Sequence, residues 1–474
     1  MAELPDKSAR FIDWYLEAVE AAGLTDKRYG VKGMNVWTPY GFLARRHLDE
    51  VLVREIEATG SAPVEFPALI PQTEFEKEKE HIKGFDTQVY WVTRGGASDL
   101  DVPLVLRPTS ETAMYPVFAL WIRSHKDLPL NVYQIVNTFR YETKTTRPFL
   151  RVREIHFFEE HTCQLNEETA TARVQSNLAA FRAMADAFAL PYLAVRRPEW
   201  DKFPGAFYSV ALDIPIGDGR TLQIGSIHHY RENFSTPYDI GYETSDGSRR
   251  LVHQTTFGLS ERLLGAIVAV HGDRRGVVFP SSIAPYQVVI VPIASKGSVS
   301  PDEAAETRAT SLRQLGIRVH VDRGEDRPGA KYYRWESRGV PLRIELGSRE
   351  AAQGKVTVVD RLGSRKEIGP ERVEEGVLAA LREFDQNLRA HADERFRQAF
   401  SVARTIEQLA GSTHVRFVSW CGDEACGHRI EAAVQGSLLG TPEGETPIPL
   451  DAVGPCIACG RTDSGRWAVA GRPI

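Results

Sequence analysis

Residues 139–159 read FRYETKTTRPFLRVREIHFFE, and this stretch decides the fold class of the 474-residue chain. Two runs of β-forming residues flank the polar loop TKTTRP (143–148), which predicts an antiparallel hairpin. On a strand, Arg140 and Glu142 would share one face, because side chains alternate. An arginine there can clamp a phosphate or carboxylate with two hydrogen bonds. A glutamate can accept a hydrogen bond from an adenine amino group, although a solvated charged hairpin is the alternative.

The surrounding residues, roughly 100–280, alternate short apolar runs with one helical pattern near 167–189. An earlier helix is predicted from near Phe42 to Gly60, a residue typical of helix C-caps. No GxGxxG or Walker loop is present, so the sequence disfavours a Rossmann or P-loop nucleotide site.

A second pattern begins after residue 285. Apolar runs at 286–294, 317–322, 340–347 and 355–361 alternate with helical segments up to about 385. This order predicts a small α/β domain with a partly parallel sheet.

The C-terminal tail combines a charged helix with a Gly/Pro-rich region that carries four of the five cysteines. The spacing Cys421-x4-Cys426 and Cys456-x2-Cys459 suits a structural Zn²⁺ site, with Gly422 and Gly460 permitting tight turns. Free thiols are the alternative. Large apolar residues are scarce beyond Trp420, so we expect the metal to hold this tail together.

Composition excludes several classes of protein. Apolar residues make up 42% and charged residues 26%, as in globular proteins, and the net charge of −5 is unlike that of a protein that coats nucleic acid. The first residues lack an apolar signal core, and no apolar run reaches the ~20 residues of a membrane span. Few cysteines, clustered as a metal site, favour a cytoplasmic location without membrane association.

A second charged motif, GLSER (258–262), precedes the apolar run LLGAIVAV and then HGDRRG (271–276). An arginine held on a buried helix requires a negative partner, because an unpaired buried charge is costly. A terminal phosphate would serve for Arg262. Pairing with Glu261 or Asp273 is the alternative.

Taken together, RPTSET (107–112), FRYE, RVREI, TLQIGSIHH (221–229), GLSER and PSSIAPYQVVIVPI (280–293) resemble class II prolyl-tRNA synthetases of the archaeal and eukaryotic type. The resemblance implies an α+β catalytic domain on an antiparallel sheet at 1–284, an α/β anticodon-binding domain at 285–385 and a small zinc-binding α+β domain at 386–474. Pro67 is similar to the proline of the family's dimer motif, which implies a homodimer.

The same resemblance implies a role for each site residue. Arg140 would hold the α-phosphate of ATP and the proline carboxylate, and Glu142 the adenine amino group. Arg151 and Arg262 would bind phosphates, and Arg140 and Arg262 would be catalytic. Gln223 and Ser260 would also contact the nucleotide. Mg²⁺ is expected with ATP, since it coordinates phosphate oxygens with few protein ligands.

The implied proline pocket draws on residues from across the chain. Thr109 and Glu111 would receive the imino group, and Phe157 and Phe203 would pack on the ring, although both phenylalanines also suit a plain core. The wall would be completed by Glu159, His161, Ser226 and His228, and structural hydrogen bonding is the alternative for the two histidines.

Some positions depart from the family pattern. Ile155 stands where an adenine-stacking phenylalanine is usual, and Glu160 is expected beside the pocket. In the second domain, donors and acceptors suited to reading unstacked tRNA bases are Lys331, Arg334, Glu336, Arg338, Arg343 and Glu345, with a solvated face as the alternative for each.

The implied activity is that of a proline–tRNA ligase, with ATP, L-proline and tRNA(Pro) as partners and no role for DNA. Two alternatives are a paralogue that activates proline or an analogue for a non-tRNA acceptor, and a catalytically silent tRNA-binding protein. The anticodon-like domain argues against the first. The presence of Arg140, Glu142 and Arg262 argues against the second.

Overall fold

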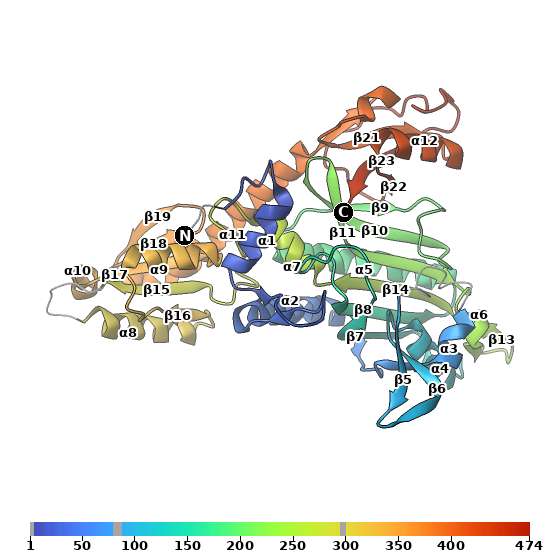
Figure 1. The fold of residues 1–474 in the computed structure, drawn as a ribbon, viewed down its shortest axis with the longest axis horizontal. Coiled ribbons are helices and arrows are strands. Elements are labelled where there is room, and N and C mark those ends of the chain that lie inside the picture. The colour runs from blue at the N-terminus through green and yellow to red at the C-terminus, as the bar shows by residue number, and fades with distance from the viewer. Residues whose placement is uncertain (1–3, 79–87, 294–299) are drawn as a thin grey trace.

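The computed structural model describes residues 4–78, 88–293 and 300–474. A large central sheet carries most of the chain, and a smaller α/β domain lies at one end (Figure 1). The long helix α11 (Val373–Gln398) runs from that domain to the C-terminal strands. Residue 385, where we expected a domain boundary, therefore lies inside a continuous helix.

Antiparallel strands form the centre of the large sheet. Their order is β9 (Leu193–Arg196), β10 (Tyr208–Gly217), β11 (Arg220–Arg231), β14 (His253–Ser260), β8 (Glu154–Gln164) and β7 (Leu130–Phe139). The short β3 (Ala62–Pro63) pairs in parallel with β7. The predicted hairpin is confirmed, since β7 and β8 pair antiparallel from Leu130↔Cys163 to Phe139↔Glu154.

The end of β7 corrects one expectation. The strand stops at Phe139, so Arg140 and Glu142 lie just beyond it and do not share a strand face. The Arg140 N–H still donates to the Arg153 carbonyl, but the Glu142 N–H turns back to the carbonyl of Arg140 at 2.7 Å. The backbone of this turn therefore sets the directions of the Arg140 and Glu142 side chains.

The predicted helices α2 (Pro39–Glu57) and α5 (Glu167–Ala187) are confirmed and cover the back of this sheet. Thr38 caps α2 by accepting from the Gly41 N–H, and Gly60 follows the helix with φ +84°. Glu160 points to this back face, where it meets Arg173 of α5 and accepts from Asn177 at 2.7 Å. Its expected position beside the pocket is wrong, because alternation along β8 sends Glu159 to the front face and Glu160 to the back.

Further elements surround the sheet. A small antiparallel sheet has the order β4 (Leu69–Pro71), β6 (Ser98–Leu106), β5 (Tyr90–Gly95). Helices α3 (Gln72–Phe75), α4 (Glu111–Trp121) and α6 (Ser235–Tyr238) lie near this small sheet. Helices α1 (Phe11–Ala21) and α7 (Arg262–His271) lie nearer the α/β domain. Two-stranded ribbons join β1 (Thr25–Asp26) to β2 (Val36–Trp37) and β12 (Gly241–Glu243) to β13 (Arg249–Leu251).

The partly parallel sheet predicted for the second domain is confirmed. Strands β16 (Val319–Val321), β15 (Val288–Ile293) and β17 (Leu342–Gly347) are parallel, and β18 (Val356–Asp360) and β19 (Arg365–Ile368) continue the sheet antiparallel. The helices of this domain are α8 (Pro301–Gln314), α9 (Pro328–Ser337), α10 (Ser348–Gln353) and the first half of α11.

The C-terminal region, defined here as residues 400–474, extends the main sheet. Its elements are β20 (Phe400–Ala403), β21 (Val415–Trp420), α12 (Glu424–Val434), β22 (Ser437–Pro442) and β23 (Arg466–Pro473). Strand β22 pairs with β9, so the described part of the chain contains one sheet of eleven strands. Val418, Ile430 and Leu438 are buried in a core of this region. Cys421, Cys426 and Cys456 belong to the same core, so a metal on the cysteines would act together with apolar packing.

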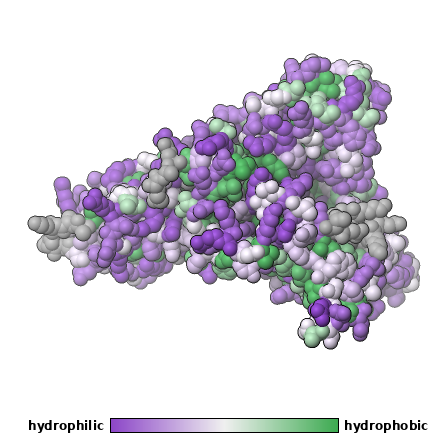
Figure 2. Space-filling view, in the orientation of Figure 1, coloured by the Kyte–Doolittle hydropathy of each residue, from purple (hydrophilic) through white to green (hydrophobic). Residues whose placement is uncertain are grey.

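The surface in Figure 2 is largely hydrophilic over the α/β domain, with apolar residues gathered beside α1. Among the described helices, none is both long and apolar enough to cross a membrane.

Candidate active site

The front face of the central sheet holds a cavity of about 520 Å³ between β8, β11 and β14 and the loop after β7. All fourteen residues predicted for ATP and proline line it: Thr109, Glu111, Arg140, Glu142, Arg151, Phe157, Glu159, His161, Phe203, Gln223, Ser226, His228, Ser260 and Arg262. Residues from seven sequence segments thus meet in one place.

Three arginines occupy one end of the cavity. Arg262 begins α7, and its Nε donates to the Leu150 carbonyl at 2.8 Å. Burial, together with the charges of Arg140 and Arg151, lowers the pKa of Arg262 to about 10. Like charges that approach this closely in a cavity form a site for an anion with several charged oxygens.

Arg140 links this end to the acidic end. Its Nε donates to the Pro108 carbonyl at 3.2 Å. Burial lowers its pKa, and the nearby carboxylates of Glu111, Glu159 and Glu142 oppose that shift. Arg140 therefore lies within electrostatic reach of both the arginine cluster and the carboxylates.

Glu111 and Glu159 form the acidic end, and both are buried. The Thr109 hydroxyl donates to Glu111, which leaves the Thr109 oxygen free to accept. Glu159 accepts from Ser110 and from Gln134 Nε2 at 2.8 Å, and lies 3.1 Å from His161 Nε2.

His161 lies between burial and the carboxylates, which have opposite effects on its pKa. Burial disfavours the positive charge of its ring, but the hydrogen bond to Glu159 and the nearby carboxylates outweigh burial and raise the pKa of His161. Burial raises the pKa of Glu159, but the hydrogen bond and charge of His161, together with the hydrogen bonds from Ser110 and Gln134, outweigh burial and lower it. The hydrogen bond between His161 and Glu159 therefore fixes both side chains at the floor of the slot.

The opposite wall is aromatic and neutral. The Phe203 ring lies 4.8 Å from the His228 ring, and burial lowers the pKa of His228 to about 3. His228 bridges Ser226 at 2.9 Å and Ser209 at 2.7 Å. On the other side, Phe157 covers Gly258, where an added Cβ would lie 3.0 Å from the ring. The result is a narrow apolar slot beside the carboxylates.

Arg197 and Glu261 have roles in the cavity that the sequence did not indicate. Arg197 donates to Asp213 Oδ1 at 3.1 Å and to Gln223 Oε1 at 2.9 Å, so it sets the orientation of Gln223. Glu261 accepts from the His156 N–H, and burial raises the pKa of Glu261 to about 7. Asp273, which the sequence offered as an alternative partner of Arg262, lies at the far end of α7 and pairs with Arg361.

The four tail cysteines form a separate cluster. The Sγ atoms of Cys421, Cys426, Cys456 and Cys459 all lie within 4.8 Å of one another. Tetrahedral zinc with Zn–S bonds of about 2.3 Å separates its sulfurs by about 3.8 Å, and Cys421 and Cys459 are 3.9 Å apart. Gly422 and Gly460 have φ of +90° and +77°, as the predicted tight turns require. The donor set fits a four-coordinate metal.

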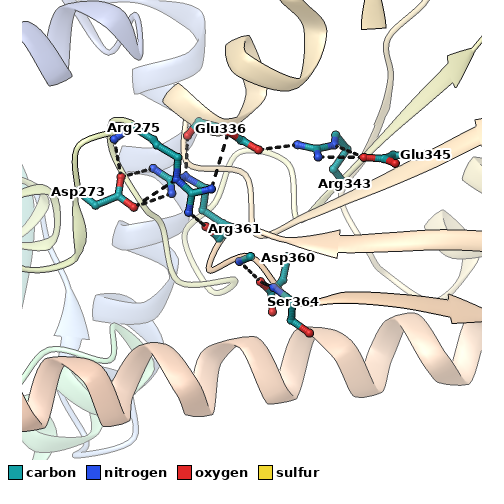
Figure 3. A network of polar contacts seen from close by, with 9 residues as sticks. Asp273, Arg275, Glu336, Arg343, Glu345, Asp360, Arg361 and Ser364 are labelled. Carbon is teal, nitrogen blue, oxygen red and sulfur yellow. Dashed lines mark hydrogen bonds and ion pairs between the residues drawn. The ribbon is translucent and has the colours of Figure 1, made fainter. Parts of the chain in front are cut away.

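Five of the six residues suggested for reading tRNA bases have internal polar partners, and Arg338 lies over the Tyr40 and Trp335 rings, 5.2 Å from each ring centroid. Lys331 is buried and donates to the Asp322 carbonyl, and Arg334 pairs with the Asp322 carboxylate. Figure 3 shows that Glu336, Arg343 and Glu345 belong instead to a chain of ion pairs that reaches Arg275.

This chain joins the two domains. Arg361 is fully buried, donates to both Asp273 oxygens at 2.7 and 2.9 Å, and donates from Nε to the Glu336 carbonyl. Asp273 and Arg275 belong to the HGDRRG motif that follows α7, so the network ties the end of that helix to the α/β domain (Figure 3).

Comparison with known proteins agrees with this geometry. Residues 90–271 match the class II tRNA synthetase core domain (G, H, P, S and T), and residues 287–380 match the anticodon-binding domain. The proline–tRNA ligase of Thermococcus kodakarensis is 51% identical over 96% of each chain, and that of Pyrococcus horikoshii is 47% identical over 97% of this chain and 98% of its own.

Solved structures give the same result. The prolyl-tRNA synthetase of Giardia lamblia, in complex with prolyl-adenylate, superposes with a TM-score of 0.92 at 30% identity, covering 99% of this chain and 100% of that one. The enzyme of Cryptosporidium parvum with halofuginone and AMPPNP also gives 0.92 at 30%, covering 100% and 99%. The chain therefore belongs to the prolyl-tRNA synthetase family of class II aminoacyl-tRNA ligases.

Proposed function

We propose that the chain activates L-proline with ATP to prolyl-adenylate, then transfers proline to the 3′ end of tRNA(Pro), releasing diphosphate and AMP. The observation that carries this proposal is one cavity with an arginine cluster at one end and a slot with two buried carboxylates at the other. The first end suits a triphosphate. The second suits a small apolar amino acid with a cationic nitrogen.

Arg140 and Arg262 are the proposed catalytic residues. The proline carboxylate attacks the α-phosphorus, an O–P bond forms, and the bond to diphosphate breaks. Charge that develops on the phosphate oxygens is stabilised by donors fixed in advance. Arg140 would contact the α-phosphate and the proline carboxylate together, which lowers the entropic cost of bringing them into line. A carboxylate is ionised at neutral pH, so this step needs no general base.

The rest of the nucleotide site uses four residues. Arg151 would bind phosphate, and Glu142, 3.8 Å from Arg151, would accept from the adenine amino group. Gln223, oriented by Arg197, and Ser260 would complete the contacts. Mg²⁺ would enter with ATP, supplying charge neutralisation on the phosphate oxygens.

The proline site would use the acidic slot. The secondary ammonium of proline has two N–H donors, and the Glu111 carboxylate and the Thr109 oxygen are two acceptors. Phe157 and Phe203 would pack on the ring. Glu159, His161, Ser226 and His228 would form the remaining wall.

The wider proposal covers assembly and location. Pro67 is exposed, and so is Leu69, two residues later. The ring of Phe66 packs against the half-exposed ring of Trp121, with ring centroids 5.7 Å apart. An apolar surface around Pro67 supports a homodimer as the working assembly. A cytoplasmic location, a Zn²⁺ ion on the four cysteines and a domain boundary at residue 284 complete the proposal; the boundary expected at 385 is not kept, because α11 continues through it.

Pyrophosphate exchange tests the activation step directly. The purified protein is incubated with ATP, Mg²⁺ and labelled diphosphate, with each standard amino acid in turn. Label should enter ATP with proline and only weakly with alanine, which leaves the slot underfilled. Exchange that another amino acid supports better than proline would refute the assignment of the slot.

A further inference from the structure

The loop of residues 197–207, between β9 and β10, has one side in the cavity and the other on the C-terminal region. Lys202 and Phe203 line the cavity. Trp200 packs on the core of the C-terminal region, which also contains Cys421 and Cys426. We propose that Trp200 is a positioning residue, through which the C-terminal region holds the aromatic wall of the proline pocket. This inference rests on the proposed function, because it takes the slot to be the proline site.

Trp200 is partly buried and packs against α12 and the end of β21. Its ring meets the edge of Trp420 at 5.8 Å and lies 4.9 Å from His428. Its Nε1 donates to Glu431 Oε1 at 3.1 Å. An added Cβ on Gly427 would lie 2.4 and 2.6 Å from two atoms of the Trp200 ring. Any larger residue at position 427 would therefore clash with the indole.

A short hydrogen-bonded turn connects Trp200 to the slot. The Pro198 carbonyl accepts from the N–H groups of Asp201 and Lys202, both at 3.0 Å, which folds the loop into a tight turn. Next, the Phe203 N–H donates to Ser209 Oγ at 2.9 Å. A tight turn transmits a shift of Trp200 to the Phe203 ring three residues away.

The base of the loop has separate supports. Strand β22 pairs with β9 at Thr441↔Arg196, and Arg197 donates to the Leu439 carbonyl at 2.9 Å. Arg197 also holds Gln223, on the nucleotide side of the cavity. Loss of the Trp200 contact should therefore loosen the proline wall and leave the nucleotide side in place.

The apparent affinity for proline depends on how often the wall is in place. If a binding-competent state is populated a tenth of the time, the apparent dissociation constant rises tenfold. Trp200→Ala removes the anchor from the loop. Gly427→Ala displaces it from the opposite side, and because alanine favours a helix interior more than glycine does, α12 itself should not be weakened.

The test measures pyrophosphate exchange by the full-length protein with proline and ATP varied separately. Trp200→Ala and Gly427→Ala should each raise the KM for proline about tenfold and change the KM for ATP less than twofold. Trp200→Phe, which keeps an aromatic ring packed against α12, should retain most of the proline affinity. Trp467→Ala is the matched control, since Trp467 lies in the same region but donates to the Asp451 carbonyl and not to the loop.

Each outcome is decisive. A proline KM within twofold of wild type in Gly427→Ala, or equal increases in the proline and ATP KM values, would overturn the positioning role. A Trp467→Ala effect as large as that of Trp200→Ala would do the same, because it would show general weakening of the region. Absence of proline-dependent exchange in the wild type would instead refute the proposed function.

Discussion

Replacing Arg262 with glutamine should stabilise the ligand-free protein while it removes most of the pyrophosphate-exchange activity. Burial and the charges of Arg140 and Arg151 lower the pKa of Arg262 from 12.5 to about 10. At about 1.36 kcal/mol for each pKa unit, the empty site disfavours this charge by roughly 3 kcal/mol. ATP phosphates reverse that penalty when they bind.

The expected gain is smaller than the full penalty. Arg262 donates to the Leu150 carbonyl at 2.8 Å and to the Gln223 carbonyl at 3.4 Å. Losing these two bonds should cost about 1 kcal/mol each, which leaves a net gain of about 1 kcal/mol. Exchange activity should fall about 10²- to 10³-fold, as when one fixed donor to a developing oxyanion is lost.

Calorimetry with and without saturating ATP and Mg²⁺ makes the test sharp. Ligand at 100 times its dissociation constant stabilises a protein by about 2.7 kcal/mol, so the wild type should melt above the variant with ATP and slightly below it without ATP. Arg182→Gln is the control, because that exposed arginine on α5 lies outside the cavity and pairs with exposed Glu445. An Arg262→Gln protein that melts well below wild type without ATP, or keeps exchange within tenfold, would refute this reasoning.

Four other results are expected. Arg140→Lys should lose exchange almost as fully as Arg140→Ala, because a point charge lacks the planar fork; near-wild-type exchange by a folded variant would remove the assignment. Burial raises the pKa of Glu261 from 4.5 to about 7, so the fold binds the proton more tightly than the unfolded chain and wild-type stability should fall as pH rises through this window. Glu261→Gln, which cannot ionise, should therefore have a free energy of unfolding up to about 3 kcal/mol above that of wild type at pH 8 and equal to it near pH 4.5. The same difference in stability at both pH values would contradict the raised pKa. Elemental analysis of protein never exposed to chelator should find about one zinc per chain, lost when Cys421 and Cys426 become serine, whereas zinc far below that level in active protein would exclude the site. Light scattering should give twice the 52.9 kDa chain mass, and monomer alone at micromolar protein would contradict the homodimer.

The sequence predicted most of the cavity because its residues lie in short motifs with fixed spacing. Strand alternation along β8 places Phe157, Glu159 and His161 on one face once the hairpin is recognised. The same alternation, counted one residue further, would have placed Glu160 on the back of the sheet. Loop geometry was less accessible, since the turn after Phe139 depends on hydrogen bonds to Gln88 and Arg153.

Long-range pairing accounts for what the sequence could not supply. Residues 386–474 were expected to form a small domain of their own, but β22 pairs with β9 and continues the catalytic sheet. Nothing in the periodicity of residues 197–207 indicates that Arg197 orients Gln223, or that Trp200 packs against α12. Both contacts join segments more than twenty residues apart, and only the fold brings them together.

Charging of tRNA(Pro) tests the central claim most directly. Wild-type protein is incubated with labelled proline, ATP, Mg²⁺ and tRNA(Pro) transcript, alongside Arg140→Ala and a non-cognate tRNA. We predict acid-precipitable prolyl-tRNA(Pro) with the wild type alone, together with proline-dependent pyrophosphate exchange. Exchange without charging would indicate a non-tRNA acceptor, and a folded wild-type protein with neither activity would be a silent tRNA-binding relative; either result would contradict the claim.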